Sequence, residues 1–279
     1  MQASTPLTWP QWRQQPLGAP FAPLAPLLAG LPAERWPTPD DLTALAAQRG
    51  LRNAAGLPLR FVPATGEKCA ALDFERRIFE QGEVQTRDCN WHDTFHACAW
   101  ALFPRAKARI NALHVAAGAA SAPNGRSPLR DLLTLFDESG IVIACADPAL
   151  AALLGGFAWH ELFWTERARV LQAMEFTVFG HALYEHCHAL YDGVTGKGIV
   201  VPVDAGYFAL PLPERLAHLD AAIDEYFALA LGAGRGPRDL QPLPLKGIPG
   251  WAAENESAAY YRDERQFRPG RLHRPRPQP

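Results

Sequence analysis

The clearest hydrophobic pattern in the chain lies between residues 90 and 117. Apolar side chains recur there at spacings of three and four residues, which place them on one face of an α-helix: Trp91, Phe95, Cys98, Ala99 and Leu102. Pro104 interrupts this pattern, and proline suits the first turn of a helix. The segment is therefore predicted to form two helices that meet at Phe103-Pro104.

Shorter patterns predict further helices and a few strands. Apolar spacing and glycine stops indicate helices over residues 40–49, 71–81, 148–154, 159–171, 176–190 and 213–231. Runs rich in β-branched residues indicate strands over residues 61–62, 141–143 and 198–203. Residues 130–136 fit a helix or a strand, and a turn is expected at 138–140. The pattern predicts an α+β fold that is predominantly helical with a small sheet.

The two ends of the chain differ from its middle. Residues 1–39 are dense in proline yet contain buried-type side chains such as Trp9 and Trp12, so we expect an extended or turn-rich arm that wraps the core. Residues 40–261 are expected to form one globular α+β domain. Residues 262–279 are rich in arginine and proline without apolar periodicity, which predicts an extended, exposed tail.

Composition excludes several classes of protein. Of the 279 residues, 48% are hydrophobic and 20% charged, which is enough apolar surface for a folded core. The formal charge of -2 gives no general attraction to nucleic acid or to an anionic membrane, although the arginine tail could make weak nucleic-acid contacts. No apolar stretch approaches the roughly 20 residues of a membrane span. With no secretory signal and no C-x-x-C pair, a cytoplasmic protein without disulfides is expected.

Two of the predicted helices carry imidazole and carboxylate groups at spacings of three or four residues. The groups are His92, Asp93 and His96 on the first helix, and His181, Glu185 and His188 on the second. A helix holds such ligands at nearly fixed separation, and this combination suits a divalent Zn, Mn or Fe ion. We therefore expect a metal site between the helices with ligands from His92, Asp93, His96, His181 and His188. Glu185 or Asp137 would serve as the catalytic base.

Other polar residues near these helices are candidates for the same pocket. They are Asn90, Lys107, Asn111, His114 and Glu138. Two of them also have a simpler interpretation: Asn90 is a good helix N-cap, and Lys107 is more simply a solvated side chain. Asp93 would favour the positive end of a helix dipole, and His188 would lie near a helix C-terminus, where cations are favoured.

Four sequence motifs in the middle and C-terminal parts of the chain resemble those of a known family. They are Asn90-Trp91-His92-Asp93 with Trp100, Phe103-Pro104, Lys107, Asn111 and His114; Leu135-Phe136-Asp137-Glu138-Ser139-Gly140; Phe179-Gly180-His181-Ala182-Leu183; and Gly247-Ile248-Pro249-Gly250-Trp251. In this order they resemble the proteobacterial domain of unknown function 3025 family over roughly residues 60–270. The resemblance implies kinship but no activity, substrate or cofactor.

Three functional hypotheses remain at this stage. The first is a metal-dependent hydrolase that acts on a small molecule. The second is a non-catalytic binding or adaptor protein, which would scatter its histidines and expose an apolar patch. The third is a helical di-iron or redox protein, which requires four carboxylates and two histidines around one cavity, with Glu75 or Glu80 as candidates for the additional carboxylates. The first hypothesis requires the segments around residues 92 and 181 to pack side by side.

Overall fold

The computed structural model describes residues 7–66, 70–120, 127–230 and 232–270 of the chain. Within these ranges the fold is predominantly helical α+β with small sheets, which confirms the predicted fold class. The division into an arm, one domain and a tail stays a prediction. Residues 271–279 of the predicted tail, among them Arg271, Arg274 and Arg276, lie outside the described ranges. Leu231, at the end of a predicted helix, lies outside them too.

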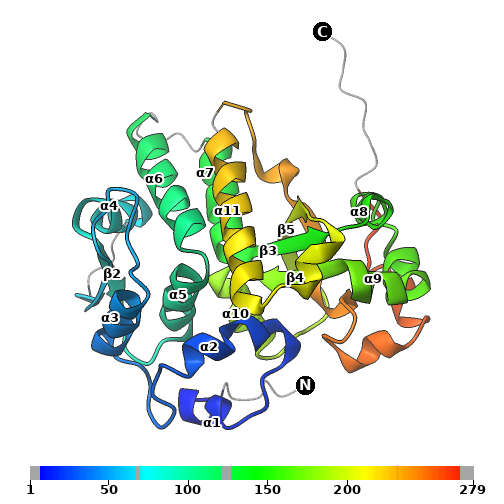
Figure 1. Cartoon of the computed structure of the whole chain (residues 1–279), viewed down its shortest axis with the longest axis horizontal. Coiled ribbons are helices and arrows are strands. Elements are labelled where there is room, and N and C mark those ends of the chain that lie inside the picture. The colour runs from blue at the N-terminus through cyan, green and yellow to red at the C-terminus, as the bar shows by residue number, and fades with distance from the viewer. Residues whose placement is uncertain (1–6, 67–69, 121–126, 231, 271–279) are drawn as a thin grey trace.

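A four-stranded sheet lies at the centre of the molecule (Figure 1). Its strands are β4 (Met174–Val178), β3 (Gly140–Cys145), β5 (Thr195–Pro202) and β6 (Gln241–Pro244), in that spatial order. β3 and β5 are parallel, and the two outer pairs are antiparallel. Every residue of β3 is buried, so both faces of this central strand are covered by the surrounding chain. The strands predicted at residues 141–143 and 198–203 lie within or overlap β3 and β5.

Four long helices pack together beside this sheet (Figure 1). They are α5 (Trp91–Leu102), α6 (Pro104–Ala120), α7 (Pro128–Ser139) and α11 (Leu212–Ala230). The predicted break between α5 and α6 is confirmed: Phe103 leaves helical geometry, with ψ 58, and Pro104 begins the next helix. α7 packs against both α6 and the sheet, so it links the helical layer to the central strands.

A smaller unit lies on the opposite side of α5 and α6 from the central sheet (Figure 1). It contains the parallel strands β1 (Arg60–Pro63) and β2 (Glu83–Thr86), with α3 (Pro39–Gln48) and α4 (Ala71–Gln81) beside them. α4 ends at Gly82, which takes the left-handed conformation (φ 70) that the glycine stop predicted. α4 also packs along α6, and this contact forms one wall of the site described below.

Two predictions near the central sheet are wrong. The helix expected over residues 176–190 begins later, because β4 occupies residues 174–178 and α10 spans only His181–Cys187. β4 is recruited by pairing with β3, which is a long-range interaction that local periodicity does not report. The turn expected at residues 138–140 is also absent: α7 continues to Ser139 and β3 begins at Gly140.

The remaining elements complete the outer surface of the fold. α8 (Pro148–Gly155) matches its prediction, whereas the helix predicted over 159–171 divides into a π-helical turn (Glu161–Thr165) and α9 (Arg167–Ala173). Short 3-10 helices follow at Ala205–Ala209, Pro237–Asp239, Leu245–Gly247, Ala253–Glu256 and Tyr260–Arg262. No helix in the described ranges has both the length and the apolar character needed to cross a membrane.

The N-terminal segment is more ordered than the proline density predicted. It forms α1 (Trp9–Arg13), a 3-10 helix (Ala19–Leu24) and α2 (Ala25–Leu28), and each of these has proline in its first turn. Proline is tolerated there because those amides need no intrahelical partner. Trp9 and Leu27 are fully buried, so the segment is part of the core.

The C-terminal tail is not wholly exposed, contrary to prediction. Gln266 and Phe267 are buried, and the Phe267 ring packs against Tyr260 and Tyr261. A single large apolar residue with such neighbours is sufficient to anchor the chain without any periodic pattern.

Candidate functional site

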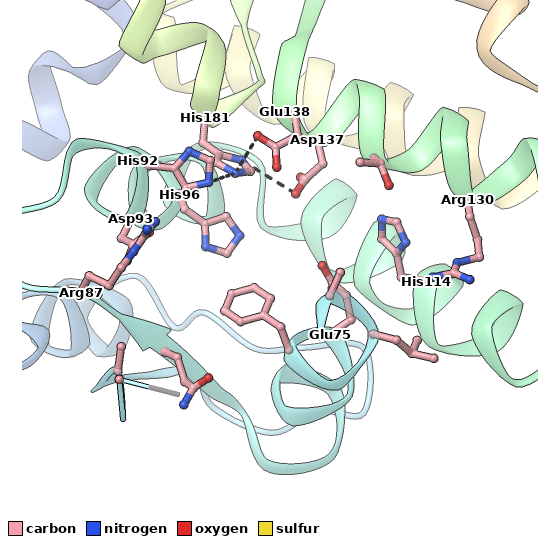
Figure 2. Close-up of a pocket in the computed structure, with 17 residues that line it drawn as sticks. Glu75, Arg87, His92, Asp93, His96, His114, Arg130, Asp137, Glu138 and His181 are labelled. Carbon is pink, nitrogen blue, oxygen red and sulfur yellow. Dashed lines mark hydrogen bonds and ion pairs between the residues drawn. The ribbon is translucent and has the colours of Figure 1, made fainter. Parts of the chain in front are cut away.

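A cavity of about 550 Å³ lies where α4, α5, α6, α7 and α10 meet. Its polar lining is rich in imidazole, carboxylate and guanidinium groups, as Figure 2 shows. The polar residues of the lining are Glu75, Gln85, Arg87, His92, Asp93, His96, His114, Arg130, Thr134, Asp137, Glu138 and His181. The cavity therefore joins the smaller unit, through α4 and β2, to the helices beside the central sheet.

Two histidines from different helices converge at one end of this cavity. His92 lies in the first turn of α5, and His181 is the first residue of α10. Their Nε2 atoms are 3.1 Å apart (Figure 2). The two helices pack directly against each other, so the side-by-side arrangement required by the hydrolase hypothesis is present.

A carboxylate lies behind each of these imidazoles. Glu185 Oε2 is 3.3 Å from His92 Nδ1, within hydrogen-bond distance, whereas Asp137 Oδ2 is 3.8 Å from His181 Nδ1, which has no hydrogen-bond partner among the described residues. Metal-binding histidines are commonly oriented in this way, with the outer nitrogen facing a carboxylate and the inner nitrogen facing the ion. The two rings thus direct their Nε2 atoms toward a shared point.

Glu138 supplies a third group at the same point. Its Oε2 atom is 3.5 Å from His181 Nε2, and ligand atoms of His92, Glu138 and His181 all lie within 4.8 Å of one another. Two nitrogen ligands about 2.1 Å from an ion are roughly 3.4 Å apart in tetrahedral and 3.0 Å apart in octahedral geometry. The observed 3.1 Å between the two Nε2 atoms fits this range. The Glu138 side chain is 41% exposed and could adjust its position without disturbing the core.

A second set of ligand-type atoms shares His181. It consists of His96, Asp137 and His181, all buried and again within 4.8 Å of one another. However, the side chain of Lys107 is only 2% exposed, and its ammonium group forms a buried ion pair with Asp137. A dication at this set would lie close to a fixed positive charge, which is unfavourable in a weakly screened interior. The set with Glu138 is therefore the better metal site.

Burial keeps the inner histidines neutral, which is the form that binds metals. It lowers the pKa of His181 to about 3, and Lys107 and His92 act in the same direction while Asp137 opposes them. Burial also moves the pKa of His96 well below its ordinary value. For Asp137, burial acts to raise the pKa, but Lys107 and His181 outweigh it and the pKa is lowered. Asp137 is therefore held as a carboxylate.

Glu75 lines the cavity from α4 and has a different electrostatic environment. Burial, with a further contribution from Asp137, raises its pKa to about 7. The Asn111 amide donates to Glu75 Oε2 at 2.7 Å and to the Glu75 carbonyl at 2.9 Å. Asn111 therefore fixes the position of a carboxyl group that changes its charge near neutral pH.

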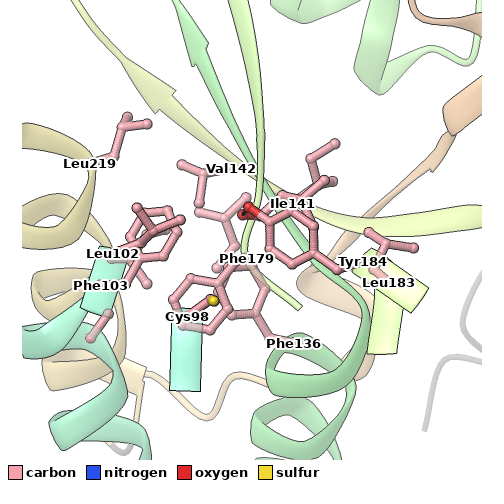
Figure 3. Close-up of a cluster of buried hydrophobic side chains, with 14 of the residues drawn as sticks. Cys98, Leu102, Phe103, Phe136, Ile141, Val142, Phe179, Leu183, Tyr184 and Leu219 are labelled. Carbon is pink, nitrogen blue, oxygen red and sulfur yellow. Dashed lines mark hydrogen bonds between the residues drawn. The ribbon is translucent and has the colours of Figure 1, made fainter. Parts of the chain in front are cut away.

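The apolar core beneath the site holds α7 and α10 together (Figure 3). The ring centroids of Phe136 and Phe179 are 4.6 Å apart, and these residues precede Asp137 and Gly180 in the chain. Gly180 allows the two segments to meet, because a Cβ at this position would lie 2.4 Å from the Glu138 carbonyl oxygen. This contact places His181 next to Asp137 and Glu138.

Comparison with known families and proteins gives one match. The family described as "Protein of unknown function (DUF3025)" matches residues 59–271, which is most of the chain. The chain belongs to this DUF3025 family. No curated protein and no solved structure matches it. Every residue that lines the cavity lies within the DUF3025 region, whereas α1 and α2 precede it.

Seven of the residues proposed from the sequence line the cavity within the DUF3025 region. They are His92, Asp93, His96, His114, Asp137, Glu138 and His181. Of these, Asp93 is engaged by Arg87, whose guanidinium donates to both of its carboxylate oxygens. Asp93 therefore holds the rim of the cavity and is a poor candidate for a metal ligand.

The other proposed residues lie outside the cavity lining. Asn90 caps α5 by accepting from the Asp93 amide. Lys107 is buried and not solvated, while Asn111 and Glu185 contact lining residues from behind. His188 lies away from the site: its ring packs among aromatic rings of the arm and α5, namely Trp12, Phe21, Trp91 and Phe95. His188 is therefore not one of the metal ligands that we propose.

Two charged lining residues, Arg87 and Arg130, were not among the candidates for the site, and Glu75 was suggested only as a carboxylate of a di-iron site. A signal for Arg130 exists, because Arg130, Thr134 and Glu138 are spaced by four residues and share one face of a helix. The signal was hidden because residues 130–136 also fitted a strand. No local pattern marks Glu75 or Arg87, whose places in the cavity depend on long-range packing.

Proposed function

We propose that this chain is a metal-dependent hydrolase whose divalent ion is held by His92, His181 and Glu138. The observation that carries the proposal is the convergence of two Nε2 atoms at 3.1 Å, each on a ring whose other nitrogen faces a carboxylate. Two histidines and one carboxylate form a known ligand set of zinc hydrolases and of non-haem iron sites. Zn, Mn and Fe all fit these donors.

The ligands would leave room for a water molecule and a substrate. His181 is 5% exposed, whereas His92 is 31% and Glu138 is 41% exposed, so the ion would lie at the edge of the cavity with an open side. A bound divalent metal lowers the pKa of its water and polarises a carbonyl or phosphoryl oxygen. Both effects favour hydrolysis.

The surrounding carboxyl groups would take different roles. Glu185 and Asp137, which the sequence suggested as bases, lie on the Nδ1 sides of His92 and His181 and are better suited to orienting those rings. Glu75 lines the same cavity and is held by Asn111. A carboxyl group with a pKa of about 7 can accept and return a proton near neutral pH, so we assign proton transfer to Glu75.

The alternative functions receive less support. A di-iron site needs four free carboxylates, but Asp93 is paired with Arg87 and Asp137 with Lys107. An adaptor would scatter its histidines, whereas four of them line one cavity here.

Elemental analysis of chain purified without a histidine tag tests the proposal. We expect about one metal ion per chain in the wild type and less than about a tenth in His181→Ala, because the variant loses the central ligand. His186→Ala is the matched control, since His186 is exposed on the same helix. Added metal should raise the melting temperature of the wild type and of the control only. Equal metal content in all three proteins, or none in the wild type, would overturn the metal site.

The hydrolytic activity needs a separate assay. The metal-loaded wild type should cleave members of a panel of small amides, esters and phosphate esters, and His181→Ala should not. Loaded protein that cleaves none of them would argue against a hydrolase while leaving the metal site intact.

A further inference from the structure

The cavity extends well beyond the proposed metal ligands, along α6 and α7. These helices run antiparallel: Lys107 pairs with Asp137 at one level, while His114, two turns further along α6, lies beside Arg130 (Figure 2) and also senses the charges of Asp137 and Lys107. His114 is seven positions after Lys107 on α6, and Arg130 is seven positions before Asp137 and eight before Glu138 on α7. At 1.5 Å per residue, the second level lies about 10–12 Å along the helices from the first. The cavity is therefore elongated, with chemically distinct ends.

Arg130 at the far end has no oppositely charged partner among the described residues. Its Nε atom is buried without a hydrogen-bond partner, and its guanidinium forms no ion pair with any residue in the described ranges. Arg87 at the other rim is different, because it makes a two-point contact with Asp93. A partly desolvated guanidinium without an acceptor is unfavourable, and an anionic ligand would relieve this cost.

The neighbours of Arg130 also suit an oxyanion. His114 lines the same end of the cavity and is 8% exposed, and burial lowers its pKa to about 4, so its neutral ring can donate one N–H. Thr134 lies one turn along α7 from Arg130 and adds a hydroxyl group to the lining. Arginine binds planar or tetrahedral oxyanions through two parallel hydrogen bonds, which gives both affinity and orientation.

Building on the proposed hydrolase function, we infer that Arg130 and His114 bind an oxyanion of the substrate, a carboxylate or a phosphate, while its scissile bond lies at the metal end. The substrate class is then a small, elongated anionic amide or ester. At the metal end, water adds to the carbonyl group and the C–N or C–O bond breaks. The products are a carboxylic acid and an amine or alcohol, and the recognised oxyanion is unchanged.

Calorimetric titration of the full-length, EDTA-treated chain tests the oxyanion site without any metal. The probes are inorganic phosphate and glutarate, and the binding of one but not the other identifies the preferred oxyanion. We expect Arg130→Gln to weaken binding of the preferred probe by at least about tenfold, as loss of a charged hydrogen-bond partner does. Arg49→Gln, at an exposed arginine directly after α3, should leave binding unchanged.

A second variant guards against misfolding. Arg130→Lys keeps the positive charge but not the two-point geometry, so its affinity should lie between those of the wild type and Arg130→Gln. Equal binding to the wild type and Arg130→Gln, or binding of neither probe to the wild type, would overturn the inference. Failure of the proposed hydrolase gives a different result: no metal in the wild type, or no cleavage by the metal-loaded chain, with Arg130-dependent anion binding retained.

Discussion

At the scale of single residues, burial determines which histidines can respond to pH. His188 packs against four aromatic rings, and its Nε2 atom is buried without a hydrogen-bond partner among the described residues. Burial lowers its pKa to about 4. The folded protein therefore resists protonation of His188 at pH values where the unfolded chain accepts the proton.

The consequence is a loss of stability in acid that His188→Phe should reduce. Because the folded-state pKa lies below the usual 6.5, the stability contribution is complete above pH 6.5 and is lost as pH falls toward 4. The variant keeps an aromatic ring but cannot titrate. We expect the free energy of unfolding to fall by about 1–2 kcal/mol less over this range than in the wild type. Urea denaturation between pH 4 and 7.5 measures this free energy for both proteins. If it fell equally with pH in the wild type and in His188→Phe, protonation of His188 would not be the cause of the loss.

The same residue shows how far sequence reasoning reaches at this scale. His181, Glu185 and His188 have the spacing of one helical face, which made all three candidates for one site. The spacing was informative for His181 and Glu185. It failed for His188, because Trp12 and Phe21, more than 160 residues earlier in the chain, cover that ring. No local pattern could report such a distant contact.

At the scale of elements, the junction between β4 and α10 controls the site. The amides of Phe179 and Gly180 both donate to the Gly140 carbonyl at 2.9 Å. A Cβ on residue 180 would also meet the backbone nitrogen of Gly140 at 2.5 Å. Backbone atoms cannot move aside as a flexible side chain can, so the close approach of α7 and α10 depends on glycine.

Gly180→Ala should therefore damage both stability and metal binding. We expect a loss of about 1–3 kcal/mol in the free energy of unfolding, and metal affinity at least about tenfold weaker as His181 moves away from Glu138. Denaturant unfolding and metal titration measure these effects. Gly155→Ala at the end of α8 is the control, because nothing lies within 4 Å of the added Cβ. Unchanged metal affinity in Gly180→Ala would exclude this positioning role.

Elements defined by strong local signals were predicted well. The proline at 104 and the β-branched run of β3 are such signals, and both elements lie where expected. β4 and β6 were missed because short strands on either side of β3 and β5 form only through pairing. Missing β4 also misplaced the start of α10, although the residue that begins it, His181, was already a candidate.

At the scale of the whole molecule, the N-terminal segment supports the two helices that carry the histidines. Trp9 is fully buried, and its ring contacts Trp12 and Trp91 at centroid distances of 5.6 Å. Its Nε1 atom donates to the Pro32 carbonyl at 2.7 Å. The segment covers the face of α5 that carries Trp91 and Phe95, next to the face that lines the cavity, although it precedes the region that matches the family.

Trp9→Ala should thus destabilise the entire fold. Truncation of a fully buried tryptophan costs about 3–5 kcal/mol in the free energy of unfolding. Urea unfolding followed by far-ultraviolet circular dichroism measures this loss, with Gln15→Ala at an exposed position of the same segment as control. A loss below about 1 kcal/mol would mean that the segment is only loosely attached.

The separation of the two converging imidazoles along the chain has a thermodynamic consequence. His92 and His181 are 89 residues apart in sequence, and an ion bound to both would close a loop of that length. A crosslink around a loop of about 100 residues reduces the entropy of the unfolded chain by the equivalent of roughly 4–5 kcal/mol. Chelation would then stabilise all the helices between these residues, and not the proposed metal site alone.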